Sequence, residues 1–293
     1  MKLISRKTLL LFFLPGAIFM GVFLIYPIIK MIIDSFYKIG ITGDRTFIGL
    51  ANYAKAFAGK GMLKQLKNTL LYILIAVGFE TVIGFFFALL FELNYKGSKV
   101  VRSLMMTPLM IAPLVAGLTW KLMMSSSFGI VNELLTRVGI LKSSSDILWL
   151  ADSKWSLIAC CIADIWLTVP FMMLMILAGL QGIDKAIVEA ARIDGANMLQ
   201  EIFYIKLPGI KPVLLTALSV RIIDAARTFD IIWAMTEGGP NSSSETISII
   251  IYKQLVKYNN TGYASAMAII FIAVLVIFTL VFMQSLWNPK KKG

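Results

Sequence analysis

Histidine is absent from this chain of 293 residues, and cysteine occurs only at Cys160 and Cys161. Without an imidazole, the protein has no histidine general base, no Ser-His catalytic pair and no histidine metal ligand. The two cysteines are adjacent within an apolar run, where neighbouring thiols rarely form a disulfide and cannot complete a metal cage. We therefore expect both to be buried apolar side chains, in a protein without a metal site or a catalytic centre.

Charged residues are also scarce: they make up 15% of the chain against 58% apolar residues, and the mean hydropathy is +0.82. Soluble domains are roughly 45–50% apolar and about 25% charged. A surface this apolar is incompatible with water, so the expected solvent is lipid. The formal net charge of +12 then indicates basic loops that orient the chain in a membrane, with no nucleic-acid partner.

Six apolar stretches are each long enough to cross about 30 Å of hydrocarbon at roughly 1.5 Å per helical residue. They are Leu9–Ile33, Thr69–Leu93, Leu104–Met124, Trp155–Leu180, Pro212–Met235 and Ala264–Trp287. The first follows basic residues, as a signal peptide does, but it is too long for one and no small-residue cleavage site comes after it, so we expect it to be retained. The sequence therefore predicts an all-α, polytopic membrane protein with six transmembrane helices.

Lysine and arginine are distributed unevenly between the segments that connect these stretches. Thirteen fall in one set of segments totalling 55 residues, and eleven fall in the alternate set totalling 93 residues. The first set comprises 1–8, 94–103, 181–211 and 288–293, and the second comprises 34–68, 125–154 and 236–263. Because basic loops remain in the cytoplasm, both termini are predicted to be cytoplasmic.

The longest of the predicted cytoplasmic segments, residues 181–211, begins with the signals of a short helix. Asp184 is placed to cap a helix that ends near Ile193. Gly195 follows and supplies the backbone freedom that a sharp turn needs.

A second short helix is predicted after this turn. Asn197 and Gln200 have the spacing of a capping box, and Pro208 is expected to end the helix, because proline disfavours helical geometry at the residue before it. Ala190 and Ala191 on the first helix are small enough for another backbone to approach closely. Residues 181–211 therefore predict a helix-turn-helix that projects into the cytoplasm, which we call the elbow.

The elbow resembles the EAA loop of ABC-importer permeases. The matching residues are Glu189, Ala190, Ala191, Gly195, Ile205, Leu207 and Pro208, with the long fixed spacing between the glycine and the final I-x-L-P. Other matches include Gly49-Leu50-Ala51-Asn52-Tyr53, Asn68-Thr69-Leu70, Gly129-Ile130-Val131-Asn132 and Thr236-Glu237-Gly238-Gly239-Pro240. Nearly the whole chain is similar to the MalF/UgpA-type permeases of the carbohydrate-uptake group.

This resemblance implies a type I ABC-importer permease fold, in which the elbow sits in a groove on a separate ATP-binding subunit. Glu189 would be the polar contact at the pivot, and Gly195 would set the angle between the two short helices. The implied coupling residues are Glu189, Ala190, Ala191, Asp194, Gly195, Ile205, Leu207 and Pro208. ATP and Mg would be bound by the partner, and this chain would hold no cofactor, consistent with its lack of a G-x-x-x-x-G-K-[ST] motif. The chain is then a transport subunit and not an enzyme.

The same resemblance implies the partners and the location. A second, homologous permease would complete the pathway in a heterodimer, two ATP-binding subunits would dock on the cytoplasmic side, and an extracytoplasmic solute-binding protein would contact the outer loops. In the last outer loop, this contact is predicted at Gly238, Gly239 and Pro240. The expected location is the inner or plasma membrane of a bacterium or archaeon, and the expected cargo is a saccharide.

The predicted organisation has three parts. Residues 1–68 form the first transmembrane helix and the first outer loop, and residues 69–287 form a five-helix permease core that contains the elbow. Residues 288–293 form a basic cytoplasmic tail.

Charges inside the predicted fifth span need an explanation, since each costs roughly 2.5–3.5 kcal/mol at a helix centre. Arg221, Asp224, Arg227 and Asp230 follow one another at intervals of three residues. Neighbours of opposite sign can therefore pair along the helix, which lowers the cost. Glu80 in the second span is also expected to form a buried ion pair.

Two polar faces form the predicted substrate pathway. On the fifth span, a helical wheel places together Arg221, Asp224, Ala225 and Thr228. On the fourth span, a shared face is predicted for Asp164, Thr168 and Phe171, which lie four and three residues apart. In the permeases that this chain resembles, the positions that match Trp166–Phe171, and those just before the T-x-G-G-P motif, line the pathway. We therefore expect the two faces to enclose the solute, with Phe171 stacked on a sugar ring.

The pairing of Arg221 decides between the possible cargoes. An unpaired Arg221 on the pathway would favour an acidic saccharide, or a polyol phosphate of the glycerol-phosphate type. An Arg221 that is neutralised by Asp224 would leave a neutral oligosaccharide. A self-sufficient secondary transporter is a further alternative, although it gives no reason for the EAA-type elbow. A membrane-embedded enzyme would need clustered polar catalysts that the sequence lacks.

Overall fold

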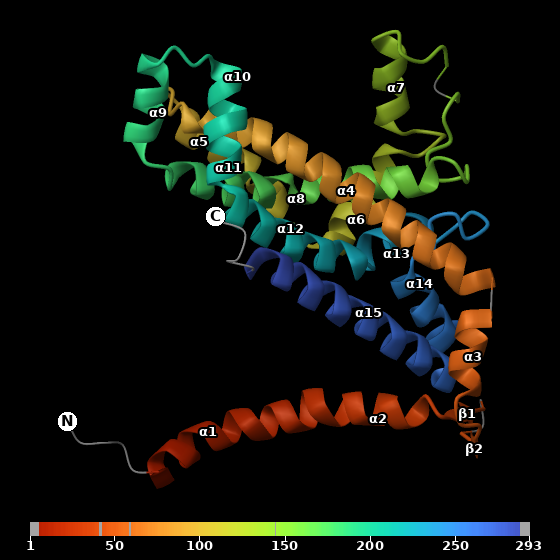
Figure 1. Ribbon diagram of the computed structural model, residues 1–293. Coiled ribbons are helices and arrows are strands. Elements are labelled where there is room, and N and C mark those ends of the chain that lie inside the picture. Colours follow the sequence, from red (N-terminus) through yellow and green to blue (C-terminus); the bar gives the residue numbers. More distant parts are fainter. Residues whose placement is uncertain (1–5, 41–42, 59, 144, 288–293) are drawn as a thin grey trace. The chain divides into compact units, whose positions relative to one another are not determined.

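The computed structural model describes residues 6–40, 43–58, 60–143 and 145–287, and most of them are helical (Figure 1). The predicted basic tail 288–293 lies outside the described residues. All the membrane-length elements in the described part are helices, which confirms the all-α fold class.

Four helices are long and apolar enough to cross a membrane by themselves. They are Leu10–Asp34, Met62–Glu92, Ser156–Gln181 and Thr261–Phe282. Two further apolar segments are bent, by 97° where Ser98–Met110 meets Pro113–Met123 and by 68° where Met198–Gly209 meets Lys211–Ala226. The described residues thus contain six spans if each bent pair counts as one span.

The third predicted span, Leu104–Met124, is not one straight helix. Helix α5 (Ser98–Met105) leads into the 3-10 turn η2 (Thr107–Met110), and α6 (Pro113–Met123) starts in a new direction. Ala112 between them is extended, with φ −61° and ψ 134°, because the proline that follows disfavours helical geometry at this residue.

The prediction of one continuous helix over Pro212–Met235 is wrong. Helix α12 (Lys211–Ala226) ends early, and a separate helix α13 (Asp230–Thr236) follows. The hydroxyl of Thr228 donates to the backbone carbonyl of Asp224 at 3.1 Å, so a side chain satisfies a carbonyl at the end of α12. The apolar composition of residues 212–235 indicated a stretch of membrane-spanning length, but it did not indicate that α12 ends at Ala226.

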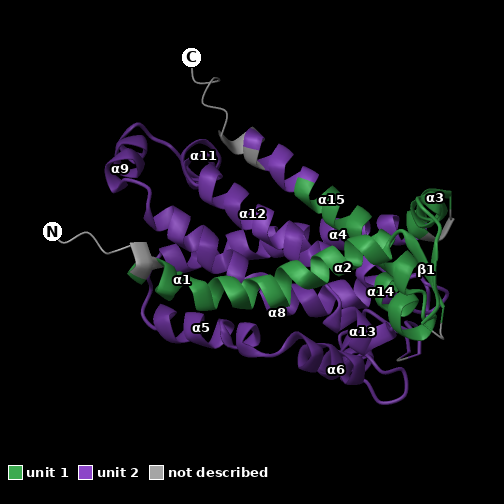
Figure 2. Cartoon of the chain, turned by 90° about the horizontal axis from the view of Figure 1, so that it is seen from below, with its two compact units in different colours: residues 1–63, 250–276 green, residues 64–249, 277–293 purple. Residues whose placement is uncertain are grey.

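Contacts divide the chain into two compact units, which Figure 2 colours separately. Unit 1 comprises residues 1–63 and 250–276, and unit 2 comprises residues 64–249 and 277–293. The predicted functional parts 1–68, 69–287 and 288–293 are a different division of the chain and stay a prediction.

Unit 1 contains the N-terminal helix, a hairpin and much of the last long helix. Its elements are α1 (Arg6–Met20), the π-helical turn η1 (Gly21–Ile25), α2 (Tyr26–Asp34), β1 (Tyr37–Ile39), β2 (Arg45–Phe47), α3 (Ala51–Ala58), the π-helical turn η4 (Lys253–Lys257) and α15 (Thr261–Trp287) up to residue 276. The two strands are antiparallel, with Tyr37 opposite Phe47. Strands of three residues are too short for an alternating pattern to reveal, so the sequence did not predict this hairpin.

Asn52 in α3 holds the chain next to this hairpin. Its side-chain amide donates to the carbonyls of Ser35 at 2.8 Å and Tyr37 at 3.0 Å. The hydroxyls of Ser35 and Tyr53 lie 2.7 Å apart. The G-L-A-N-Y motif therefore has a structural role in unit 1, because its asparagine and tyrosine fix the start of the predicted outer loop.

Unit 2 contains most of the helices in the described part of the chain. Besides α5, η2, α6, α12 and α13, its elements are α4 (Lys60–Glu92, from residue 64), α7 (Ile130–Arg137), α8 (Ser156–Gln181), α9 (Lys185–Ile193), α10 (Met198–Gln200), the π-helical turn η3 (Glu201–Lys206), α11 (Leu207–Gly209) and α14 (Ile247–Tyr252, to residue 249). Helix α12 packs against α8, and α13 packs against α6 and α8.

Two clusters of buried apolar side chains form the core of unit 2. One includes Cys160 and Cys161 as free, fully buried thiols, which confirms that they are apolar interior residues. The other surrounds Met172 and Met173 of α8. Both clusters draw on α4, α8 and α12, so these three helices form the centre of the unit.

Helices α4 and α8 approach closely at Gly84. A Cβ atom at this position would lie 2.9 Å from Met172 Cβ and 3.0 Å from the backbone nitrogen of Met173. Neither atom is the end of a flexible side chain, so a larger residue at position 84 would push the helices apart.

We predict that Gly84→Val lowers the thermal stability of the purified permease, because overpacking costs about 1–3 kcal/mol. Gly78→Val on the same helix is the matched control, since a Cβ atom there has no neighbour within 4 Å. On heating in detergent, followed by gel filtration, Gly84→Val should lose its monodisperse peak several degrees below the wild type, and Gly78→Val should not. Equal melting of both variants would contradict the packing constraint.

Candidate functional site

The first arm of the elbow is the predicted capped helix. The Asp184 carboxylate accepts the backbone N–H of Ala186 at 2.9 Å, and α9 continues to Ile193. Gly195 has a φ of +86°, in the left-handed region that side chains with a Cβ rarely adopt. The capped helix and the glycine turn are therefore both confirmed.

The second arm also begins as predicted. The Asn197 side chain accepts the Gln200 N–H at 2.9 Å, and the Gln200 side chain accepts the Asn197 N–H at 2.8 Å. This reciprocal pair is a complete capping box.

The second arm ends at Gly209, one residue beyond the predicted end at Pro208, and the chain then bends by 68° into α12. The predicted reason is wrong, because Leu207 before the proline stays helical, with φ −63° and ψ −44°. The helical path widens into the π-helical turn η3, where the Leu207 N–H bonds to the Ile202 carbonyl five residues earlier. It then continues through Pro208, and the Ile210 N–H bonds to the Lys206 carbonyl at 2.9 Å. Pro208 is tolerated because it stands in the first turn of α11, where a missing N–H costs little.

Two ion pairs that the sequence did not predict fix the elbow. The Arg192 guanidinium donates to both carboxylate oxygens of Glu201, at 2.6 and 3.0 Å, and so joins the two arms. These hydrogen bonds lower the pKa of the Glu201 carboxyl. Lys206 donates to Glu92 at 2.8 Å and joins the second arm to the end of α4. The sequence did offer one signal for the first pair, because Arg192 and Glu201 have opposite charges and lie on either side of the predicted turn at Gly195.

The outer surface of the elbow is unusually apolar. Ile193 next to the turn is 87% exposed and Tyr204 is 78% exposed. Other exposed large apolar side chains here are Met198, Leu199 and Phe203. We call these five exposed apolar residues of the elbow the apolar tip.

The predicted coupling residues differ in exposure. Those exposed to solvent are Glu189, Ala190, Asp194, Gly195 and Pro208, and those partly buried are Ala191, Ile205 and Leu207. The elbow therefore presents two acidic and several small residues outward, and the second arm is anchored inward. Their contact with an ATP-binding subunit stays a prediction.

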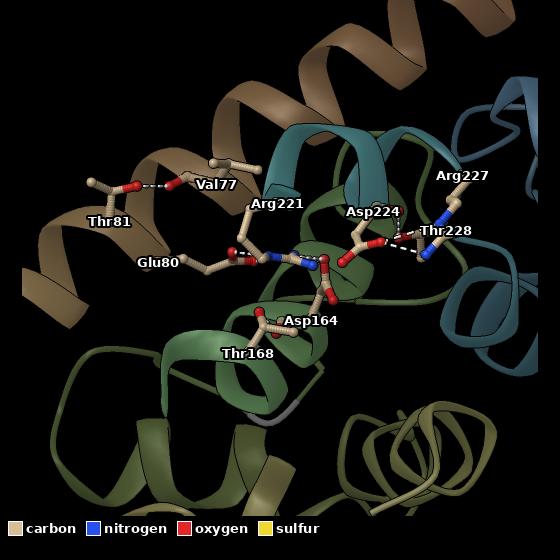
Figure 3. Close-up of polar contacts among 9 residues, drawn as sticks. All are labelled: Val77, Glu80, Thr81, Asp164, Thr168, Arg221, Asp224, Arg227 and Thr228. Atoms are coloured by element: carbon tan, nitrogen blue, oxygen red, sulfur yellow. Dashed lines mark hydrogen bonds and ion pairs between the residues drawn. The ribbon is translucent and has the colours of Figure 1, made fainter. Parts of the chain in front are cut away.

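Arg221 of α12 lies between α4 and α8, where it binds two carboxylates (Figure 3). Its guanidinium donates to both oxygens of Glu80, at 2.7 and 2.9 Å, and to Asp164 at 3.2 Å. The side chains of Arg221, Glu80 and Asp164 are 6%, 0% and 5% exposed. We call these three residues the buried triad. The described residues include no cluster of three or more metal-ligating side chains.

The triad corrects the predicted pairing of Arg221. Arg221 is neither unpaired nor neutralised by Asp224, because Asp224 bonds to Arg227 at 2.6 and 3.1 Å (Figure 3). Pairing along the helix thus occurs for Asp224 and Arg227 only, while Arg221 pairs across helices. The predicted buried ion pair of Glu80 is confirmed.

The predicted pathway residues fall into two groups. Asp164, Arg221 and Ala225 are buried within unit 2, and those partly exposed are Thr168, Phe171, Asp224 and Thr228. The Thr168 hydroxyl donates to the Asp164 carbonyl at 2.6 Å, so its proton is already committed to the backbone of α8. The role of both faces in lining a pathway stays a prediction.

The loop between α13 and α14 contains the predicted binding-protein contact, and it is firmly held. The Gly239 N–H donates to the Thr236 carbonyl at 2.9 Å, and the Ser244 hydroxyl donates to the Gly239 carbonyl at 2.7 Å. Gly238 has a φ of +84°, and a Cβ atom there would lie 3.0 Å from an isoleucine methyl, so only glycine is accommodated. Pro240 follows through a cis peptide bond.

Asn68 near the start of α4 supports this loop across the sequence. Its side-chain amide donates to the carbonyls of Ser242 and Glu245, each at 3.0 Å. Gln65, one turn earlier, donates to the buried Glu245 carboxylate. In the sequence, Asn68 is only one of the residues that match the permeases. Its role in supporting this loop is visible only in the structure.

We predict that Arg221→Met is strongly destabilising, because it leaves Glu80 and Asp164 buried without a counter-charge, a change that costs about 3–5 kcal/mol. Arg227→Met is the matched control: its ion pair with Asp224 is exposed, and such pairs contribute roughly 0.2–1 kcal/mol. Thermal melting in detergent should separate the two variants clearly. Adding Glu80→Gln and Asp164→Asn to Arg221→Met removes the two buried negative charges and should restore part of the lost thermal stability. If the triple variant is no more stable than Arg221→Met, the uncompensated charges are not the cause of the destabilisation.

Residues 80–292 match the family described as "Binding-protein-dependent transport system inner membrane component". The trehalose/maltose transport system permease protein MalF of Thermococcus litoralis is 34% identical, over 97% of this chain and 95% of that protein. The sulfoquinovosyl glycerol transport system permease protein SmoG of Agrobacterium fabrum is 34% identical, over 96% of this chain and 90% of that protein.

Two solved structures share the fold. A chain of a bacterial ABC transporter involved in the import of the acidic polysaccharide alginate has a TM-score of 0.83 at 23% identity, over 97% of this chain and 96% of that chain. A chain of the bacterial alginate ABC transporter in complex with alginate pentasaccharide-bound periplasmic protein has a TM-score of 0.80 at 24% identity, over 98% and 96%. The predicted importer-permease fold is therefore confirmed.

Proposed function

The chain belongs to the family of binding-protein-dependent transport system inner membrane components, and we propose that it is the permease subunit of an ATP-driven saccharide importer. As a member of this family it is a multi-pass protein of the inner membrane. In the proposed importer, it forms half of the translocation pathway and is coupled to an ATP-binding subunit by the elbow.

The coupling role rests on one observation, the combination of an exposed apolar tip with firmly held arms. The tip would enter a groove on the ATP-binding subunit, which would cover its apolar surface. The Arg192–Glu201 ion pair joins the two arms, and the Lys206–Glu92 ion pair joins the second arm to α4. A displacement of the tip would therefore move the ends of α4 and α12 instead of bending the elbow.

The same displacement would reach the centre of the membrane through the buried triad. Arg221 on α12 is bound to Glu80 on α4 and Asp164 on α8, so these helices are expected to move together. Nucleotide-driven closure on the cytoplasmic side would then change the spacing between this subunit and its partner. The pathway would open as a change between subunits, with unit 2 acting as a rigid body.

The remaining subunits follow from the same proposal. ATP and Mg would be bound by two copies of the partner ATP-binding subunit, and a second, homologous permease would supply the other half of the pathway. A solute-binding protein would contact the loop at Gly238, Gly239 and Pro240, whose fixed geometry suits a docking surface. Both termini and the elbow would lie on the cytoplasmic side.

For the cargo, we propose a neutral oligosaccharide. One relative is named for the transport of trehalose and maltose and another for that of sulfoquinovosyl glycerol, so sugar derivatives are common to both. Their charge is not common to them, because trehalose and maltose are neutral and the sulfonate of sulfoquinovosyl glycerol is anionic. An acidic cargo or a polyol phosphate would need an available cation on the pathway. Arg221 does not meet this need, because its guanidinium is buried and bound to two carboxylates.

We predict that Gly195→Val uncouples transport, because valine cannot adopt the φ of +86° without strain. A Cβ atom at this position has no neighbour within 4 Å, so the effect is confined to the backbone. Gly195→Asn is the matched control, since asparagine tolerates left-handed geometry. Glu189→Lys, which reverses the charge on the outer surface, should also uncouple.

The measurement is solute uptake by cells, normalised to the amount of permease in the membrane, together with ATPase activity stimulated by the binding protein. Uptake should fall at least about tenfold for Gly195→Val and Glu189→Lys, equivalent to roughly 1.4 kcal/mol of coupling free energy, and should remain near the wild type for Gly195→Asn. Normal uptake by Gly195→Val and Glu189→Lys at normal expression would contradict the proposed coupling.

A competition experiment tests the cargo. In proteoliposomes that contain the complete transporter, unlabelled neutral oligosaccharides should inhibit uptake, whereas acidic oligosaccharides and glycerol phosphate should not. Inhibition by acidic ligands alone would contradict the neutral cargo. Import by this chain alone, without ATP or partner subunits, would instead favour a secondary transporter.

A further inference from the structure

A cavity of about 690 Å³ lies between the ends of α4 and α8, the beginning of α5, and α9 of the elbow. This volume is in the range of pockets that hold small molecules, about 300–1,000 Å³. The cavity is lined on the α4 side by Phe91 and Glu92 and on the elbow side by Val188 and Glu189. The apolar tip does not contribute to it, although Glu189, which is also one of the predicted coupling residues, does.

The lining of this cavity has an excess of positive charge. Two of its cations are already neutralised, because Lys206 pairs with Glu92 and Arg192 pairs with Glu201. The three other lining cations, which form no ion pair within the described residues, are Lys99, Arg102 and Lys185. Among the described lining residues, Glu189 is the only other acidic one, so the cavity favours an anion.

Helix α5 combines two of these cations with an exposed apolar surface. Lys99 and Arg102 line the cavity, while Val100, Val101 and Leu104 are 64%, 41% and 67% exposed. A short amphipathic helix with adjacent cations is typical of elements at a membrane interface. Basic pockets on the cytoplasmic side of membrane proteins bind the head groups of anionic lipids. A soluble phosphate would satisfy the cations but would leave the apolar surface of α5 uncovered.

We propose that this cavity binds the phosphate-bearing head group of an anionic phospholipid, with the acyl chains lying along Val100, Val101 and Leu104. Lys99, Arg102 and Lys185 contact the phosphate. The bound lipid bridges α5 and α9, and it lies beside the Lys206–Glu92 pair that joins the elbow to α4. The lipid therefore stabilises the position of the elbow; this consequence, unlike the binding itself, rests on the proposed coupling function.

The test uses the permease purified with the subunits that copurify with it, delipidated and then reloaded with dioleoyl-phosphatidylglycerol or dioleoyl-phosphatidylcholine. Native mass spectrometry measures how many lipids each complex retains. The test variant is Lys99→Gln combined with Arg102→Gln. The matched control is Lys96→Gln combined with Arg137→Gln, which removes the same two residue types at exposed positions outside the cavity.

The wild type and the control should retain one phosphatidylglycerol with at least about tenfold preference over phosphatidylcholine, and the test variant should lose this preference. Equal retention by the test variant and the control would overturn the proposal. Displacement of phosphatidylglycerol by millimolar inorganic phosphate or glycerol phosphate would also overturn it, by identifying a soluble anion as the ligand. If phosphatidylglycerol is retained only by permease that has no other subunit bound, the cavity is covered by a protein partner in the complex, and the proposal is overturned.

Lipid retention is measured without transport, so its failure can be told apart from failure of the proposed function. If the wild type retains the lipid but neither Gly195→Val nor Glu189→Lys affects uptake, the cavity proposal stands and the coupling proposal fails. If those variants uncouple transport while the test variant still retains phosphatidylglycerol, the coupling proposal stands and the cavity proposal fails.

Discussion

The packing of unit 2 depends on a single buried guanidinium. Arg221 reaches from α12 to Glu80 on α4 and Asp164 on α8, and all three side chains are almost fully removed from solvent. A charge in such a place is stable only when it is hydrogen-bonded and paired, so α4, α8 and α12 must meet with their polar groups in register. The close contact of α4 with α8 at Gly84 and the apolar clusters around it depend on that same arrangement. The triad thus specifies which helices form the centre of the permease.

This use of Arg221 also limits the chemistry that remains for a cargo. A guanidinium held by two carboxylates cannot offer a free charge to a solute, which is why we propose a neutral oligosaccharide. The groups still available on α8 and α12 are partly exposed, and they include the aromatic ring of Phe171 and the Asp224–Arg227 pair. Specificity would then come from ring stacking and from hydroxyl contacts, completed by the second permease.

The elbow shows how local signals and long-range contacts combine in one functional element. The caps at Asp184 and Asn197 depend only on neighbouring residues, and they shape each arm. The ion pair Arg192–Glu201 then joins the two arms to each other, and the ion pair Lys206–Glu92 joins the second arm to α4. The cavity next to this attachment is lined by three cations that have no ion-pair partner in the described part of the chain, so the attachment itself is a suitable place for an anionic lipid to act.

By itself, the sequence determined the lipid environment, the all-α class, the caps and turn of the elbow and the resemblance to importer permeases, because each of these depends on composition or on residues close together in the chain. It did not determine the breaks near Ala112 and Thr228, the path through Pro208 or the partner of Arg221. A hydropathy pattern is the same for a straight and a broken helix, and a helical wheel detects only partners on its own helix. Glu80 and Arg221 are 141 residues apart, and only the folded chain brings them into contact.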